Sequence, residues 1–324
     1  MRYPASEKLE IIRLVEQSHL PVKRTLGKLG VSRPTFYRWY DLYRRFGEAG
    51  LEDRRAGPRR VWNRIPETVR GQVIDLALER PELSPRELAV TFTDERAQFV
   101  SEASVYRLLR AHGLLTSPTF IVMKAADEFR DKTTAPNQLW QTDFTYLKVT
   151  GWGWFYLSTV LDDFSRFIVA WKLCTTMKVA DVTDTLDLAL TAAGLDHTGR
   201  RPRLLSDNGS SYVAGDLASW LDDQGIAHVR GAPNHPMTQG KIERWHQTLK
   251  NRILLEHYFL PGDLERQIAA FVDHYNHRRY HESLNNLTPA DVYLGQGPSI
   301  LQRREEIKRR TIEQRRLQHH QAAA

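Results

Sequence analysis

Three acidic residues, Asp143, Asp207 and Glu243, have the side-chain types and the spacing to do chemistry together. Sixty-three residues separate the first two, and 35 separate Asp207 from Glu243. Carboxylate oxygens are the ligands that hard divalent cations such as Mg²⁺ prefer. Two such ions can clamp both the attacking and the leaving oxygen of a phosphoryl displacement. We therefore interpret the three acids as catalytic residues and as metal ligands of a phosphodiester reaction.

The residues around these acids make the pattern specific, because 39 acidic residues allow many chance spacings. The three contexts are Leu-Trp-Gln-Thr-Asp-Phe-Thr-Tyr, Leu-Leu-Ser-Asp-Asn-Gly-Ser and Gln-Gly-Lys-Ile-Glu-Arg-Trp-His-Gln-Thr-Leu-Lys. They resemble the Asp-Asp-35-Glu core of retroviral-type integrases and insertion-sequence transposases, and most closely the IS3 group. The resemblance implies a ribonuclease-H-like fold and cleavage and strand transfer of DNA. It also implies a cofactor of two Mg²⁺ ions, for which Mn²⁺ could substitute.

The elements expected around the three acids agree with that fold. Three aromatic and β-branched runs followed by alternating helices and strands predict a mixed α/β sheet with helices packed on it. Asp143 then lies within the first strand, Asp207 just after the fourth strand, and Glu243 in the first turns of a helix. The expected strands are 139–149, 154–161, 166–175, 203–206 and 227–230, and the expected helices are 179–193, 214–224 and 239–255.

Basic residues close to Glu243 are candidates for holding DNA. Positions three, four and seven residues apart share one face of a helix, which places Lys250 beside Glu243. In integrase-like families basic residues on this face grip DNA, so the resemblance makes Lys250 the first candidate and Lys241 and Arg244 the next. The alternative is that Lys250 is an ordinary surface lysine.

Other titratable residues compete for a role and are interpreted as structural. Asp162 and Asp163, in Leu-Asp-Asp-Phe-Ser-Arg, are explained by turn chemistry. The spacing of His274, His277 and His281 could serve zinc, but no cysteine or clear fourth ligand accompanies them.

Residues 1–50 predict a helix-turn-helix that binds DNA. Gly30 suits a left-handed helix end, Ser32 an N-cap, and Pro34 the first turn of a third helix. That third helix is the candidate recognition helix, whose N-terminal residues would face the major groove. The alternative is a three-helix bundle that binds nothing. The candidate DNA-contacting residues are Arg33, Thr35, Tyr37 and Arg38.

The remainder of the chain divides by composition. Three segments come before the catalytic core: a basic linker (51–65), a second helical module that resembles another helix-turn-helix (66–116) and a connector (117–138). The catalytic core with its C-terminal motif covers 139–295, and a basic tail covers 296–324. Residues 1–62 hold 14 Lys/Arg against 7 Asp/Glu, and residues 301–324 hold 7 against 3. Two basic ends around a slightly acidic centre are typical of DNA-contacting flanks. The tail itself could be a basic helix, on DNA or between protomers, or a disordered end.

Composition narrows the class of protein further. No run of 18 apolar residues predicts a membrane span, the N-terminus has no signal-peptide core, and the single cysteine, Cys174, fits a reducing cytoplasm. The expected partners are double-stranded DNA, both element ends and target, and further copies of the chain, because each chain supplies one set of acids for two ends. The alternative function is that of a domesticated or inactive transposase acting as a sequence-specific DNA-binding protein.

Overall fold

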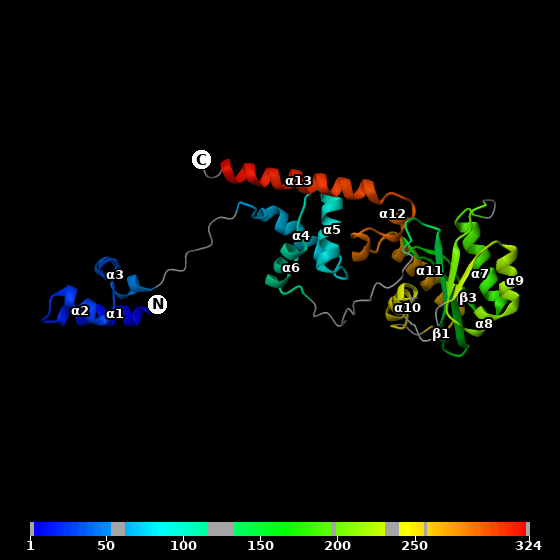
Figure 1. Ribbon diagram of the computed structural model, residues 1–324, viewed down its shortest axis with the longest axis horizontal. Coiled ribbons are helices and arrows are strands. Elements are labelled where there is room, and N and C mark those ends of the chain that lie inside the picture. The colour runs from blue at the N-terminus through cyan, green and yellow to red at the C-terminus, as the bar shows by residue number, and fades with distance from the viewer. Residues whose placement is uncertain are drawn as a thin grey trace. The chain divides into compact units, whose positions relative to one another are not determined.

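The computed structural model describes residues 3–52, 62–115, 133–195, 199–230, 240–255 and 258–321 (Figure 1). They form two compact units, Met1–Arg64 and Ile65–Ala324. The predicted linker 51–65 and connector 117–138 lie mostly outside the described residues. Within the described residues, no helix combines the length and the hydropathy that crossing a membrane requires.

The first unit is the predicted set of three helices followed by one 3-10 turn. Gly30 ends the second helix in the left-handed region, with φ at 67°, as expected. Ser32 occupies the N-cap position, but its hydroxyl bonds the Thr35 hydroxyl at 2.7 Å instead of a backbone N–H. Phe36 and Trp39 are buried in a small core, so the opposite face of the third helix is left to solvent. The elements are α1 (Ala5–Gln17), α2 (Val22–Leu29), α3 (Arg33–Phe46) and η1 (Glu48–Leu51).

The second unit begins with three further helices, α4 (Glu67–Glu79), α5 (Pro85–Arg96) and α6 (Glu102–Ala111). The capping box predicted at Ser84 is present, because its side chain accepts from the Glu87 N–H while the Glu87 carboxylate accepts from the Ser84 N–H. Apolar residues from all three helices form one core.

A five-stranded mixed sheet follows, in the order β3-β2-β1-β4-β5. β1 pairs with β2 and β2 with β3 in antiparallel fashion, whereas β4 runs parallel to β1, and β5 parallel to β4. This is the ribonuclease-H-like arrangement that the sequence predicted. The strands are β1 (Leu139–Val149), β2 (Gly153–Asp162), β3 (Ile168–Cys174), β4 (Arg203–Ser206) and β5 (His228–Arg230).

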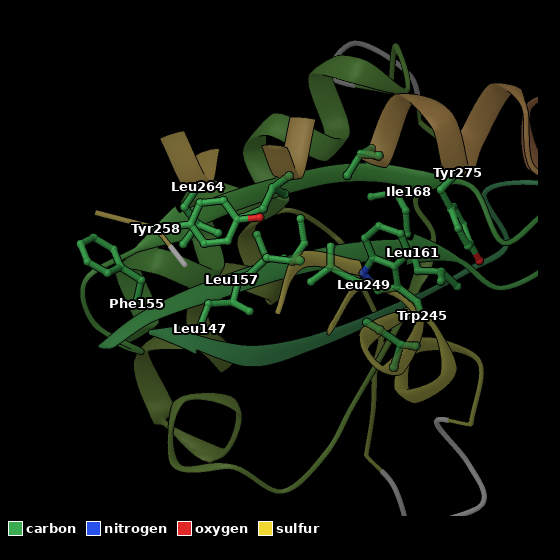
Figure 2. Close-up of a cluster of buried hydrophobic side chains, with 14 of the residues drawn as sticks. Leu147, Phe155, Leu157, Leu161, Ile168, Trp245, Leu249, Tyr258, Leu264 and Tyr275 are labelled. Carbon is green, nitrogen blue, oxygen red and sulfur yellow. The ribbon is translucent and has the colours of Figure 1, made fainter. Parts of the chain in front are cut away.

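Helices cover both faces of the sheet. Val160, Val182 and Leu217 belong to the core on one face, which α7 (Val179–Ala192), α8 (Ser210–Val213) and α9 (Gly215–Asp223) cover. On the other face, Trp245 and Leu249 pack with the strands (Figure 2). That second core holds α10 (Gly240–Ile253) and α11 (Pro261–His277) against the sheet. The short α8 was not predicted.

The C-terminal segment contains η3 (Glu282–Leu284), α12 (Pro289–Tyr293) and the long helix α13 (Gly297–Gln321). The described part of the basic tail is helical, which favours the basic helix over the disordered end among the alternatives that the sequence left open. α13 is fastened to the end of α5: Arg304 pairs with Asp94 at 2.6 Å, and the Phe99 N–H donates to the Thr311 hydroxyl at 3.0 Å. Part of the tail's positive charge therefore serves folding within the chain.

Candidate active site

Strand pairing brings Asp143 and Asp207 to the same end of the sheet. The parallel pairing of β1 with β4 matches Leu139 with Arg203 and Gln141 with Leu205. Two residues further along that register, Asp143 lies level with position 207, just after β4 ends. Backbone N–H groups orient both carboxylates, since Phe144 donates to Asp143 Oδ1 at 2.8 Å and Gly209 donates to Asp207 Oδ1 at 2.9 Å.

Helix α10 carries Glu243 to this end of the sheet. Ile242 and Trp245 on either side of it are buried in the core, which fixes the helix and turns Glu243 outwards. The Ile242 N–H donates to the Gln141 side-chain oxygen at 3.2 Å, which ties the first turn of α10 to β1. Partial desolvation raises the pKa of Glu243, and the negative charge of Asp143 raises it further. Asp143 and Glu243 therefore lie close enough to repel each other.

Tyr212 links the two aspartates. Its ring is buried and its hydroxyl lies 3.4 Å from the Thr142 hydroxyl. Burial raises the pKa of Tyr212, and the negative charges of Asp143 and Asp207 raise it as well. Asp143 is thus electrostatically coupled to Glu243, and it shares the neighbourhood of Tyr212 with Asp207.

The donor chemistry of these residues fits a divalent cation. All three side chains offer oxygen atoms only, and the repulsion between Asp143 and Glu243 is relieved by positive charge placed between them. Over the described part of the chain, no three His, Cys, Asp or Glu side chains are already gathered as a metal site.

His246 is a neighbour of the site that the sequence did not single out. Its Nδ1 lies 3.4 Å from Asp143 Oδ2, and its side chain is only 8% exposed. No described residue makes a hydrogen bond to its Nε2. Positions 243 and 246 are three apart along α10, so both side chains share a helix face. That spacing is the signal that could have identified His246.

The carboxylates of Asp162 and Asp163 are occupied by structural contacts, in agreement with their interpretation as turn residues. Asp162 is fully buried and accepts from the N–H groups of Asn137 and Ser165, at 2.7 and 2.8 Å. Asp163 accepts from the Gln141 side-chain amide at 2.8 Å. Both acids therefore stabilise the turn after β2.

The predicted DNA contacts near Glu243 have different surroundings. The Lys241 ammonium lies 2.8 Å from Asp163 Oδ2 and donates to the Asp163 carbonyl, so it already fastens α10 to the turn after β2. Arg244 is exposed to solvent. The Lys250 ammonium lies 4.6 Å from the centre of the Tyr146 ring. Unlike Lys241, Arg244 and Lys250 are thus not held by an ion pair with a carboxylate among the described residues.

The candidate contacts of the first unit are accessible from solvent. Arg33, Tyr37 and Arg38 are exposed on α3, and Thr35 is half-buried with its hydroxyl bonded to Ser32. This is the face that a recognition helix would present to a major groove, and their contact with DNA stays a prediction.

The matches to known families agree with this geometry. Residues 133–236 and 224–289 each match an integrase core domain. Residues 7–59 match a helix-turn-helix domain, and residues 35–109 match a homeodomain-like domain. The mixed sheet and its acids therefore fall within residues that match an integrase core domain, and residues that match helix-turn-helix domains precede them.

Among curated proteins the chain is similar to transposases of bacterial insertion sequences. It is 30% identical over 164 residues to the transposase of IS904 from Lactococcus lactis, a match that covers 49% of this chain and 62% of that protein. It is 27% identical over 199 residues to the transposase of IS629 from Shigella sonnei, covering 60% and 66%. It is 27% identical over 185 residues to the transposase InsF of IS3A from Escherichia coli K12, a match that covers 56% of this chain and 60% of that protein.

The chain is therefore similar to transposases of the IS3 type and contains residues that match an integrase core domain. The matched region spans between 60% and 66% of the length of these relatives.

Solved structures with a similar fold include two viral integrases. The HTLV-2 integrase catalytic core domain in complex with magnesium matches with a TM-score of 0.41 and 19% identity, over 50% of this chain and 99% of that one. The simian T-cell lymphotropic virus intasome in complex with PP2A regulatory subunit B56 gamma matches with a TM-score of 0.44 and 18% identity, over 68% and 74%. These are likenesses of fold alone.

Proposed function

We propose that this protein cuts a DNA strand and joins the resulting end to another DNA, as a divalent-metal-dependent transposase. The observation that carries the proposal is the placement of Asp143 within an integrase core. Its charge acts on Glu243, and the strand register sets it level with Asp207. These two relations support the assignment of the three carboxylates, from β1, from the end of β4 and from α10, to one catalytic site.

Asp143, Asp207 and Glu243 are the proposed catalytic residues and metal ligands. Two Mg²⁺ ions, or Mn²⁺ in their place, would supply Lewis-acid activation of the phosphodiester and neutralise the charge that develops on it. The protein's own contribution is to orient the carboxylates through the N–H groups of Phe144 and Gly209. No protein side chain has to form a covalent intermediate.

The basic residues of the chain supply the DNA contacts of the proposal. Arg244 and Lys250 extend from the same helix as Glu243 and would hold phosphates next to the scissile one. The exposed residues of α3 would recognise the ends of the element, while phosphate contacts make binding dependent on salt. Joining two ends in one event requires two sets of acids, so the active species would be a multimer of this chain on DNA.

Glu243→Gln provides the decisive experiment. The substitution keeps the size of the side chain and removes the charge that holds a cation, so cleavage and joining of DNA in Mg²⁺ should fall by about a thousandfold or more. Binding of duplex DNA in a band-shift assay should stay unchanged. Glu265→Gln, at an exposed position of α11, is the matched control and should behave as wild type.

Two results would reject the proposal. The first is wild-type joining by Glu243→Gln. The second is a wild-type chain that binds its DNA specifically yet shows no cleavage in Mg²⁺ or Mn²⁺, which would favour an inactive transposase acting as a DNA-binding protein.

A further inference from the structure

The hairpin formed by β1 and β2 exposes aromatic side chains to an unusual extent. Tyr146, Trp152 and Trp154 are 57%, 62% and 55% exposed. The rings of Tyr146 and Trp154 meet edge to face, with their centres 5.9 Å apart. Large apolar rings gathered on one surface are uncommon in monomeric proteins and mark a binding surface.

Two lysines lie against these rings. The Lys250 ammonium is 4.6 Å from the centre of the Tyr146 ring, and the Lys148 ammonium is 5.9 Å from that of Trp154. Neither lysine pairs with a carboxylate in the part of the chain that the structure describes. Tyr146, Lys148, Trp152, Trp154 and Lys250 are called the hairpin strip below.

Helix α10 connects the hairpin strip to the proposed catalytic acids. Lys250 follows Glu243 by seven residues and shares its helix face, and its ammonium lies over the Tyr146 ring. Tyr146 follows Asp143 by three residues on β1, so the two side chains lie on opposite faces of that strand. β4 pairs with β1 only as far as Gln141. Among the described strands, none lies on that side of the segment of β1 that carries Tyr146 and Lys148, and both side chains are exposed to solvent.

We propose that the hairpin strip binds an unpaired DNA strand leading away from the cleaved phosphate, with bases stacked on the aromatic rings and phosphates held by Lys148 and Lys250. The inference rests on the proposed function and adds a substrate feature to it, namely that the DNA beside the cleavage point is single-stranded when bound. Aromatic rings alternating with basic residues are the chemistry by which proteins bind single strands.

Charge and ring geometry favour this ligand over two others. In duplex DNA the base faces are stacked on one another, so exposed rings find no base to cover. A second protein chain would have to desolvate two lysines at the centre of the contact, whereas lysine is depleted from protein interfaces. A single strand satisfies both kinds of group at once.

The test measures binding and not chemistry. A fluorescein-labelled oligothymidylate is titrated with the full chain in EDTA, and its anisotropy gives the affinity. Tyr146→Ala and Trp154→Ala should each weaken binding about tenfold, because each removes one stacking platform. Leu188→Ala on α7 is the control, since it removes a side chain that is also about half exposed, at 50%, from a helix that contributes no residue to the hairpin strip. Affinity for a duplex end should change less than twofold in all variants.

A second measurement locates the strand directly. An oligonucleotide carrying 5-iodouracil, photo-crosslinked to the full chain, should give adducts on the peptide that contains Tyr146, Trp152 and Trp154. Unchanged single-strand affinity in Trp154→Ala, or adducts confined to the helix-turn-helix regions, would overturn the inference. Loss of self-association in Trp154→Ala without loss of single-strand binding would overturn it too, in favour of a second copy. If the hairpin strip binds single strands but the protein shows no metal-dependent cleavage, the proposed function is rejected and the inference about the strip stands.

Discussion

Asp143 and Asp162 lie on neighbouring strands of the same sheet, yet they differ in burial and in the number of hydrogen bonds that their carboxylates accept. The Asp162 carboxylate is fully buried and accepts three hydrogen bonds, two from N–H groups and one from the Ser165 hydroxyl at 2.6 Å. The Asp143 side chain is 22% exposed and accepts one backbone hydrogen bond, and its other oxygen faces His246 at 3.4 Å. Of the two, Asp143 is the one whose charge acts on Glu243, an acid of α10.

This difference separates an acid that holds the fold from one that is available to a ligand. Burial raises the pKa of Asp162, and the hydrogen bonds from Ser165 and Asn137 oppose that rise by stabilising the charged form. The repulsion between Asp143 and Glu243, by contrast, is not offset by a comparable set of donors. A carboxylate left in that condition costs stability until a cation arrives.

The matched substitutions Asp143→Asn and Asp162→Asn test this comparison with the same chemical change. For Asp143→Asn we expect the largest effect, a loss of DNA cleavage by about a thousandfold or more, because a metal ligand is lost. The free energy of unfolding should change by less than about 1 kcal/mol, since the amide oxygen can still accept from Phe144. Strand-cleavage rates in Mg²⁺ and urea unfolding in EDTA measure the two effects. A variant that unfolds as it loses activity would make Asp143 a structural residue.

Asp162→Asn should do the reverse. The new amide places an NH₂ group against donors that the carboxylate satisfied, so we expect unfolding to become easier by about 1–3 kcal/mol. Cleavage per folded molecule should stay within about twofold of wild type at a temperature where the variant is folded. A large loss of activity in a variant of normal stability would contradict the structural role.

The sequence predicted the strands that carry the acids better than it predicted which side chains lie around those acids. The bounds of β1 and β4 were as expected, because their apolar runs are bordered by clear turns. The contacts of Lys241 and His246 were not foreseen, because each depends on how α10 docks against β1 and the turn after β2. Periodicity places a residue on a helix face, whereas only tertiary packing decides which carboxylate that face meets.

The state of the tail also depended on packing. Its basic composition was compatible with a solvated end or with a helix, and the docking of Arg304 on Asp94 favours the helix. A partner 210 residues away in the sequence gives no local signal.

Lys241 sharpens the comparison, because it joins the helix of Glu243 to the structural turn. In Lys241→Met the ion pair with Asp163 is lost while the aliphatic part of the side chain remains. The lysine side chain is 35% exposed, so solvent screening limits the expected loss to about 1 kcal/mol in urea unfolding. Asp163 keeps its bond from Gln141. A tenfold or greater loss of DNA affinity at constant stability would instead make Lys241 a direct DNA contact.

The smallest expected effect is a pH dependence of the metal-free protein that originates at Glu243. Its folded-state pKa is raised above the usual value for a glutamate, by desolvation first and by Asp143 second. A raised pKa means that the folded state binds this proton more tightly than the unfolded state, so stability contributed by the protonated form is lost as pH rises through the folded-state value. Glu243→Gln removes the titrating group, and in EDTA it should therefore gain stability over wild type on going from about pH 4 to about pH 7.

Mg²⁺ should stabilise the wild type more than the variant at the higher pH, because a ligand that binds only the folded state raises its stability. Thermal unfolding of both proteins at the two pH values, with and without Mg²⁺, measures this. An advantage of the variant that shrinks as pH rises would show that the charge of Glu243 is not the source of the strain.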